Sequence, residues 1–318
     1  MDLSAVREFR ARHRRALALA SRPTSLIAIG GIVLLLVAAA LGTAIAPYGA
    51  SQLDLAHSFQ GPASGHLLGA DELGRDVLSR VVAGARYSVV SAISVLTIAL
   101  VAGTLVGALA GYFGGVVDEL LMRVTDIFLA FPSLVLALAI SVTLGGGLRS
   151  AILAVGAVWW PAYARLVRGQ VLGTKSNDYV EAARALGVGH MRVLTVHILR
   201  NCMTPVLVQL TLDMGNVLVT FAGLSYLGLG APPGSPEWGA TISDGQNYIL
   251  TAWWIALFPG VALYLSALVL NLGGELLGDI LMPGRATRLG SGRGRRHRLG
   301  SRRGPLTPVP AGPETGDA

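Results

Sequence analysis

Charge is scarce in this sequence of 318 residues. Only 14% of the residues are Asp, Glu, Lys or Arg, whereas 53% are hydrophobic. A soluble domain carries about 25% charged residues, so this chain lacks the polar surface that would cover a water-facing globule. The composition excludes an ordinary soluble protein and indicates an integral membrane protein.

Cysteine and catalytic motifs are also scarce. The single cysteine, Cys202, cannot form an internal disulfide, and the six histidines are scattered without the spacing of a metal site. Residues 173–176 come closest to a phosphate-binding loop, but Thr174 separates the glycine from the lysine. Ser225 lacks the flanking glycines of a hydrolase elbow, and His-Glu-x-x-His is absent. We therefore expect no catalytic residue, no metal and no cofactor bound by this chain.

Six apolar segments are each long enough to cross a bilayer, which takes about 20 helical residues. They cover residues 26–46, 89–109, 127–144, 152–171, 205–227 and 252–272. The first follows a basic leader but exceeds the core of a signal peptide, which is about 7–15 residues long, so we expect an uncleaved span. The predicted fold class is an all-α membrane protein with six transmembrane helices.

The basic residues predict the orientation. If the N-terminus is inside, 21 of the 25 Lys and Arg residues fall on the inner side and 4 on the outer side. Such a bias is typical of cytoplasmic segments, so we expect both termini in the cytoplasm. The basic ends, residues 1–24 and 284–318, are then membrane-flanking tails, and no nucleic-acid partner is expected. The second tail is also Pro-rich and too poor in apolar residues to fold, which predicts disorder.

The inner loop between the fourth and fifth spans carries two short helical patterns. Asp178 can cap the first helix, with Glu181 three residues on, and Gly187 can end it in the left-handed conformation. Residues 188–199 indicate a second short helix. Two amphipathic helices at a membrane surface serve either as a structural connection or as a docking element for a partner, and the residues alone favour neither.

Asp213 is the polar exception within the spans, about nine residues into the fifth. A charge at that depth costs about 2.5–3.5 kcal/mol on insertion scales, so it should face the bundle interior or a water-filled path. A role in the translocation pathway and a helix–helix hydrogen bond are equally compatible with this position.

The loop also carries a family resemblance. EAARALG at residues 181–187, followed by HMRVLTVHILRN at 190–201, resembles the EAA loop of ABC-importer permeases, which docks on an ATPase subunit. The matching residues are Glu181, Ala182, Ala183, Gly187, Ile198, Leu199 and Asn201. The family usually has proline where this chain has Arg200, a departure expected either to loosen the turn after the second helix or to add a charge contact. It also commonly has an acidic residue where this chain has Phe221.

Two further segments, residues 66–89 and 223–260, resemble dipeptide, oligopeptide and nickel permeases, and the chain most closely matches the second permease of the pair. The resemblance implies a first span with an outer segment over residues 25–87 and a five-helix core over residues 88–283. It implies ATP-driven import across a bacterial inner membrane of a peptide or a related small solute, such as a nickel chelate or a glycoside. The implied partners are a second permease in a heterodimer, two ATP-binding subunits that hold ATP and Mg, and an extracytoplasmic solute-binding protein.

Three other classes of function fit the sequence less well. A stand-alone secondary transporter or channel would predict coupling-ion acids in several spans, but only Asp213 lies deep. A membrane enzyme would need a catalytic constellation, and a scaffold without transport gives no reason for the EAA-like loop.

Overall fold

The computed structural model describes residues 23–282, and within this range the regular elements are helices, joined by loops that include one isolated bridge between Ala70 and Asp76. The predicted all-α membrane fold is confirmed. The basic tail predicted over residues 1–24 falls almost entirely outside the described residues, and the tail predicted over 284–318 falls entirely outside them.

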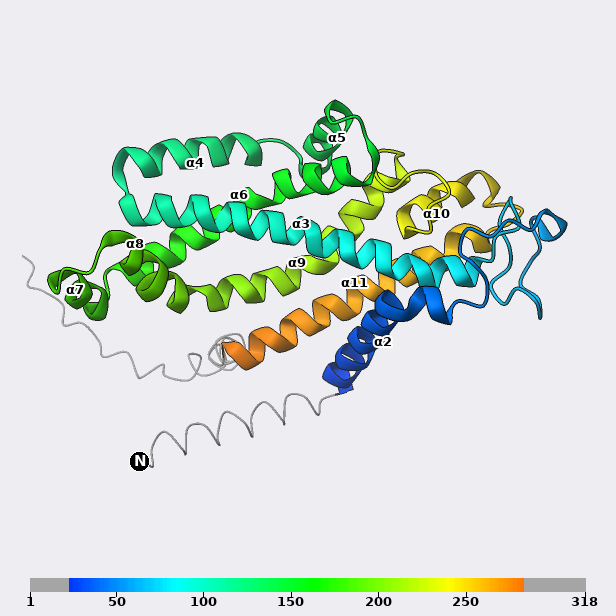
Figure 1. The fold of residues 1–318 in the computed structure, drawn as a ribbon, viewed down its shortest axis with the longest axis horizontal. Coiled ribbons are helices and arrows are strands. Elements are labelled where there is room, and N and C mark those ends of the chain that lie inside the picture. Colours follow the sequence, from blue (N-terminus) through cyan, green and yellow to red (C-terminus); the bar gives the residue numbers. More distant parts are fainter. Residues whose placement is uncertain (1–22, 283–318) are drawn as a thin grey trace, which may run out of the picture. The chain divides into compact units, whose positions relative to one another are not determined.

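Long apolar helices form the body of the structure (Figure 1). Within residues 23–282, five helical stretches are long and apolar enough to cross a membrane. They are α2 (Pro23–Ile45), α3 (Val77–Phe113), α6 (Gly147–Lys175), His190–Tyr226 and α11 (Trp254–Leu281). A sixth crossing is available if the bent pair α4 (Gly115–Leu129) and α5 (Ser133–Thr143) counts as one span. The shorter elements are η1 (Leu55–His57), α7 (Asp178–Ala185), α8 (His190–Arg192), α10 (Trp238–Gly245) and η3 (Gln246–Tyr248).

The span predicted at residues 127–144 is not one unbroken helix. The helix axis turns by 93° between α4 and α5, at residues 130–132. Pro132 precedes α5; it has no N–H to donate, and its ring disfavours helical geometry at Phe131. Because the residues at the break are apolar, the hydropathy pattern runs through it unchanged.

The closest helix pair in the bundle is α3 with α6. Gly103, Gly107 and Gly111 lie four residues apart on α3 and face α6. A Cβ at Gly103 would lie 2.4 Å from Cβ of Tyr163, and one at Gly107 would lie 2.3 Å from the carbonyl oxygen of Ala164. Small residues let two backbones approach this closely in lipid, where packing replaces the hydrophobic effect as the source of association.

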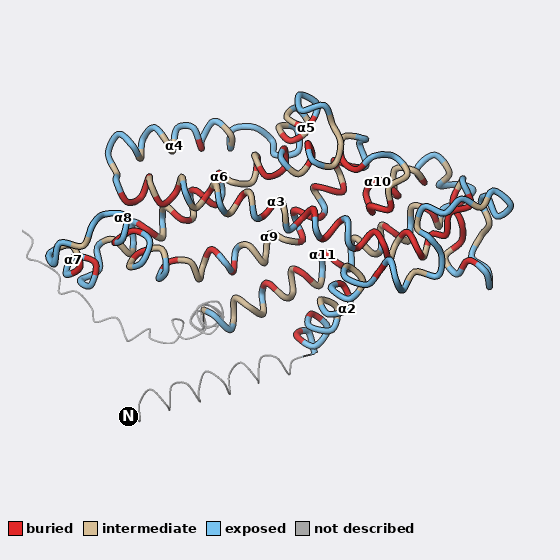
Figure 2. The backbone as a smooth tube through the Cα atoms, in the orientation of Figure 1, coloured by how far each residue is buried: buried red, intermediate tan, exposed pale blue. Residues whose placement is uncertain are grey.

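Burial separates the central helices from the outer ones (Figure 2). The buried apolar core draws mainly on α3, α6 and α9 (Arg200–Tyr226). In contrast, α2 exposes large apolar side chains, including Leu34 at 70% and Leu26 at 60%. Water would disfavour such a surface and lipid tails solvate it, so the exposure pattern agrees with a multi-pass membrane protein.

Candidate functional site: the α7 loop, the Asp213 cavity and a buried charge cluster

The first feature of the candidate site is the start of α7, which carries the EAA-like residues. Asn177 is the N-cap residue, and its carbonyl oxygen accepts from the N–H groups of Val180 (2.9 Å) and Glu181 (3.2 Å). Asp178 is the first helical residue, and its side chain is exposed. Its predicted capping role is therefore wrong, although a carboxylate in the first turn still interacts favourably with the helix dipole.

Gly187 ends α7 as predicted. Its φ is +77°, a left-handed conformation that glycine adopts without steric cost. The N–H of Gly187 donates to the carbonyl of Arg184 (2.9 Å), and the N–H of Val188 donates to that of Ala183 (3.1 Å). These two bonds form a Schellman motif, which satisfies the last carbonyls of the helix.

The predicted second short helix is not a separate element. α8 continues through η2 (Val193–Leu199), a π-helix, directly into α9, so that His190–Tyr226 is one continuous helix. Arg200 has helical dihedrals (φ −55°, ψ −35°), and no turn follows η2. Arginine supplies the backbone N–H and the helical preference that a proline at this position would lack.

The last residues of the EAA-like segment, residues 198–201, hold α7 against η2. Val180 and Ala183 of α7 are buried, as is Ile198 of η2. Asn201 donates to the carbonyl of His197 (2.8 Å) and to the hydroxyl of Tyr179 (3.2 Å). The apolar contact and the polar bonds together fix the orientation of α7 relative to the long helix.

On its other side α7 presents an exposed surface with both charge and apolar area. Leu186 is 84% exposed and Met191 59% exposed, while Glu181 and Ala182 are also exposed. Exposed apolar side chains beside polar ones are typical of protein–protein contact sites. The exposed residues on this side are Glu181 and Ala182 of α7, Leu186 at its end, and Met191 of α8.

Sequence reasoning missed Tyr112, which connects three elements at the end of α3. Its hydroxyl lies 2.9 Å from Nδ1 of His190, and its carbonyl accepts from Nζ of Lys175 at 2.5 Å. The guanidinium of Arg184 lies 5.4 Å from the centre of its ring, within cation–π range. Tyr112 therefore anchors α6, α7 and α8 to α3.

The second feature of the site surrounds Asp213 on α9. The hydroxyl of Tyr163 donates to Oδ2 of Asp213 (3.0 Å), and Nε2 of Gln209 donates to Oδ1 (3.1 Å). The bond from Tyr163 joins α6 to α9, so the helix–helix hydrogen bond is present. The carboxylate also borders a cavity of about 420 Å³ lined by residues of α4, α5, α6 and α9, among them Leu129, Ser133 and Trp159.

With this geometry established, comparison with known proteins identifies the family. The model of the family described as "Binding-protein-dependent transport system inner membrane component" matches residues 103–286. The chain belongs to this family. It is a permease subunit of an ABC importer, and its family consists of transport subunits rather than enzymes.

Three curated relatives illustrate the similarity. The chain is 40% identical over 252 residues to the "Probable D,D-dipeptide transport system permease protein DdpC" of Escherichia coli K12, covering 79% of this chain and 85% of the relative. It is 41% identical over 265 residues to the "Di/tripeptide transport system permease protein DppC" of Pseudomonas aeruginosa, covering 80% and 88%. It is 39% identical over 259 residues to the "Glutathione transport system permease protein GsiD" of Pectobacterium atrosepticum, covering 81% and 86%.

In this permease the start of α3 and the segment before it are attached to α10 by a cluster of largely buried charges that sequence reasoning missed. Arg80 is fully buried and donates to Oδ2 of Asp244 at 3.0 Å and to the carbonyl of Ser235 at 3.1 Å. Arg75 donates to Oδ2 of Asp71 at 2.6 Å. Burial raises the pKa of Asp244, while the two neighbouring guanidinium groups act in the opposite direction and favour its charged form.

Glu237 is another buried acid in the same region, and it caps α10. Its Oε2 accepts from the N–H of Ala240 (2.9 Å), and its Oε1 accepts from the hydroxyl of Ser88 (3.1 Å) on α3. Burial raises the pKa of this carboxyl, and the backbone donors lower it in part. The Ser88–Glu237 contact is a second polar attachment between α3 and α10.

Proposed function

We propose that the chain forms one half of a heteromeric pathway that imports a peptide or a related small solute. The similarity to relatives named as dipeptide, di/tripeptide and glutathione permeases supports this substrate class. A second permease would supply the other half, two ATP-binding subunits would carry ATP and Mg, and a solute-binding protein would deliver the substrate from outside.

The observation that carries the coupling role is the seating of α7 on the long helix. Buried Val180 and Ile198 and the Asn201 bonds hold α7 in place, while Glu181 and Leu186 remain exposed. A short, rigidly held helix with an exposed mixed surface suits docking into a groove on an ATPase. We therefore propose that the exposed residues Glu181, Ala182, Leu186 and Met191, which we call the coupling surface, contact the ATP-binding subunit.

The proposed topology places both termini in the cytoplasm and α7 on the same side. The alternation of the five long helices and the α4–α5 pair supports this arrangement, as does the distribution of Lys and Arg. We also propose that residues 25–87 are an extension of the importer core at 88–283. The two parts share one helix, because residue 87 lies within α3.

Affinity purification of the tagged chain from gently solubilised membranes, followed by mass spectrometry, tests the assembly. We expect a second permease and ATP-binding subunits to co-purify. Recovery of a stable, monodisperse chain alone would contradict the proposal and favour a stand-alone transporter.

We further propose that Asp213 acts in the translocation pathway. Asp213→Asn should lower the uptake rate about tenfold or more, because it removes a charge beside the cavity, while the amount of protein in the membrane stays unchanged. Tyr163→Phe is the matched control: it removes the hydrogen bond between α6 and α9 but keeps the carboxylate. Uptake should stay within about threefold of the parent in this control, because the carboxylate remains beside the cavity and a single hydrogen bond adds only about 0.5–1.5 kcal/mol to stability. Parental uptake in the Asp213→Asn protein would refute the pathway role.

A further inference from the structure

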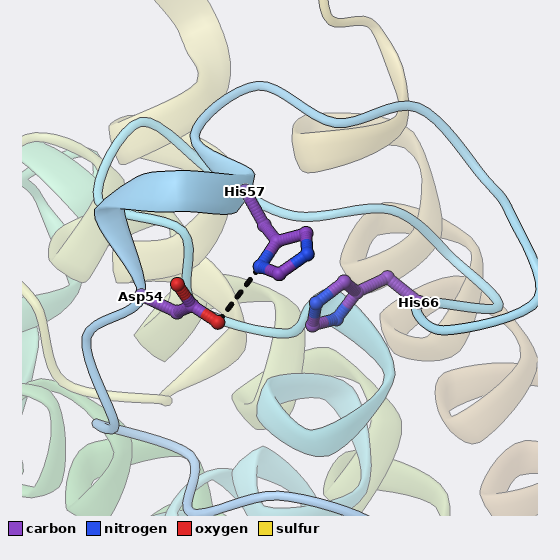
Figure 3. Close-up of side chains that lie close together, drawn as sticks. All are labelled: Asp54, His57 and His66. Carbon is purple, nitrogen blue, oxygen red and sulfur yellow. Dashed lines mark hydrogen bonds and ion pairs between the residues drawn. The ribbon is translucent and has the colours of Figure 1, made fainter.

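Three metal-ligating side chains come together in the segment between α2 and α3. Asp54, His57 and His66 each offer one ligand atom, and these atoms all lie within 4.8 Å of one another. Figure 3 shows the side chain of His66 reaching from a neighbouring stretch of chain toward His57 and Asp54. The sequence spacing does not match a known metal motif, because the folding of residues 58–65 is what brings His66 back to the other two.

We propose that Asp54, His57 and His66 bind a divalent first-row transition metal, for which Zn²⁺ is the representative ion. Two imidazoles and one carboxylate suit Zn²⁺ and its neighbours in the series, whereas Ca²⁺ and Mg²⁺ prefer sites made entirely of oxygen. Three protein ligands leave one position for water or another small ligand. A metal site is not part of the transport role proposed above. Only the location of the site on the extracytoplasmic side rests on the proposed topology.

A buried hydrogen bond to Asp76 fixes the orientation of the His66 ring. Its Nδ1 lies 2.9 Å from Oδ1 of Asp76, and both side chains are buried. An ionised carboxylate only accepts hydrogen bonds, so Nδ1 of His66 carries the proton and Nε2 is left with the free lone pair. A carboxylate that orients a histidine in this way is the usual partner behind a metal-bound imidazole.

The partner carboxylate is itself fixed. Oδ2 of Asp76 accepts from the backbone N–H of Ser79 at 2.8 Å and from its hydroxyl at 2.6 Å, which makes Asp76 the N-cap of α3. On its other side the ring of His66 packs against Tyr48, with ring centres 5.0 Å apart. His66 is therefore a preorganised ligand attached to the end of a long helix.

The other two ligands are placed by a single helical turn. Asp54 precedes η1 and His57 ends it, and residues three apart lie above one another on a 3₁₀ turn. Nδ1 of His57 is 2.8 Å from Oδ2 of Asp54, and its ring centre is 5.3 Å from that of His66. Ligands at Zn²⁺ distances of about 2.0–2.1 Å in a tetrahedron stand about 3.3–3.5 Å apart. The side chains of Asp54 and His57 are 44% and 46% exposed, so both have room to rotate toward that spacing when a metal binds.

Metal binding to the purified full-length chain tests the proposal directly. The chain is prepared in detergent with a tag free of histidine, stripped with a chelator, and titrated with Zn²⁺ by calorimetry, with bound metal counted by mass spectrometry. We expect one strongly bound Zn²⁺ per chain. His57→Gln and Asp54→Asn should each weaken Zn²⁺ binding about tenfold or more. Loss of even a hydrogen-bond partner that orients a metal ligand has an effect of this size.

The matched control is His197→Gln, which removes a histidine of η2 away from the cluster and should bind Zn²⁺ like the parent. A thermal unfolding series gives a second readout: Zn²⁺ should raise the unfolding temperature of the parent but not that of His57→Gln, because a ligand stabilises only the state that binds it. Mg²⁺ at the same concentration should produce no shift. If the parent retains no Zn²⁺, or if His57→Gln and Asp54→Asn bind Zn²⁺ as tightly as His197→Gln, the proposal is overturned.

Discussion

Glu181→Arg together with Gly187→Pro is expected to reduce ATP-driven uptake about tenfold or more while the chain still inserts into the membrane. Proline fixes φ near −65°, whereas Gly187 has a φ of +77° and its N–H donates to Arg184. The Schellman motif that ends α7 is therefore lost. Glu181→Arg reverses a charge on the exposed coupling surface, and loss of a central interface contact costs about 2 kcal/mol or more. The measurement is uptake and ATP hydrolysis by the assembled transporter in liposomes.

Two controls separate a docking defect from misfolding. Glu181→Arg alone leaves the end of α7 intact and should lower uptake without lowering the amount of folded protein. Glu119→Arg reverses another exposed acid, on α4, and should leave uptake near the parental rate. Unchanged uptake in the double variant would refute the docking role of α7, as would an equal loss in Glu119→Arg.

Arg80→Ala should destabilise the permease by about 3–5 kcal/mol, the usual cost of removing one partner of a buried ion pair. Arg80 is fully buried, and the substitution leaves the carboxylate of Asp244 without its nearest donor. The attachment of residues 71–80 to α10 would weaken with it. The measurement is the unfolding temperature in detergent, together with the yield of folded protein from membranes.

Arg86→Ala is the matched control, because Arg86 lies on the same helix with an exposed side chain. Its effect should stay within about 0.5 kcal/mol, as is typical of surface substitutions. Adding Asp244→Ala to Arg80→Ala should recover part of the lost stability, since it removes a half-buried carboxylate that has lost its nearest donor. Equal unfolding temperatures for Arg80→Ala and Arg86→Ala would contradict the role of the cluster.

Composition predicted the class of fold because membrane spans are defined by length and apolarity alone. It could not predict the 93° bend at Pro132, since Phe131 and its neighbours are as apolar as the helices they separate. The continuity of the helix through Arg200 was missed for a different reason. The expected turn came from the resemblance to a family with proline there, and arginine is compatible with an unbroken helix.

The candidate site was predictable where its geometry is local. Gly187 was correctly predicted to end α7, because a left-handed helix end depends only on nearby residues. The capping residue was placed one position too late, at Asp178 instead of Asn177. The burial of Arg80 had no local signal, since its partner Asp244 lies 164 residues further along the chain. Long-range pairs of this kind, and the proximity of the His66 and His57 side chains, arise only in the folded structure.

The continuity of His190–Tyr226 has a mechanical consequence. At 1.5 Å per residue, this stretch of 37 residues is a stiff rod about 55 Å long. One end lies beside α7, and Asp213 lies about 35 Å along the axis from His190. A tilt of about 5° about the end beside α7 would displace Asp213 by about 3 Å, so the helix can act as a lever between the two features of the site. The π turn at Val193–Leu199 and Pro205 both interrupt regular α-helical hydrogen bonding between α7 and Asp213, and we expect the lever to bend at these positions first.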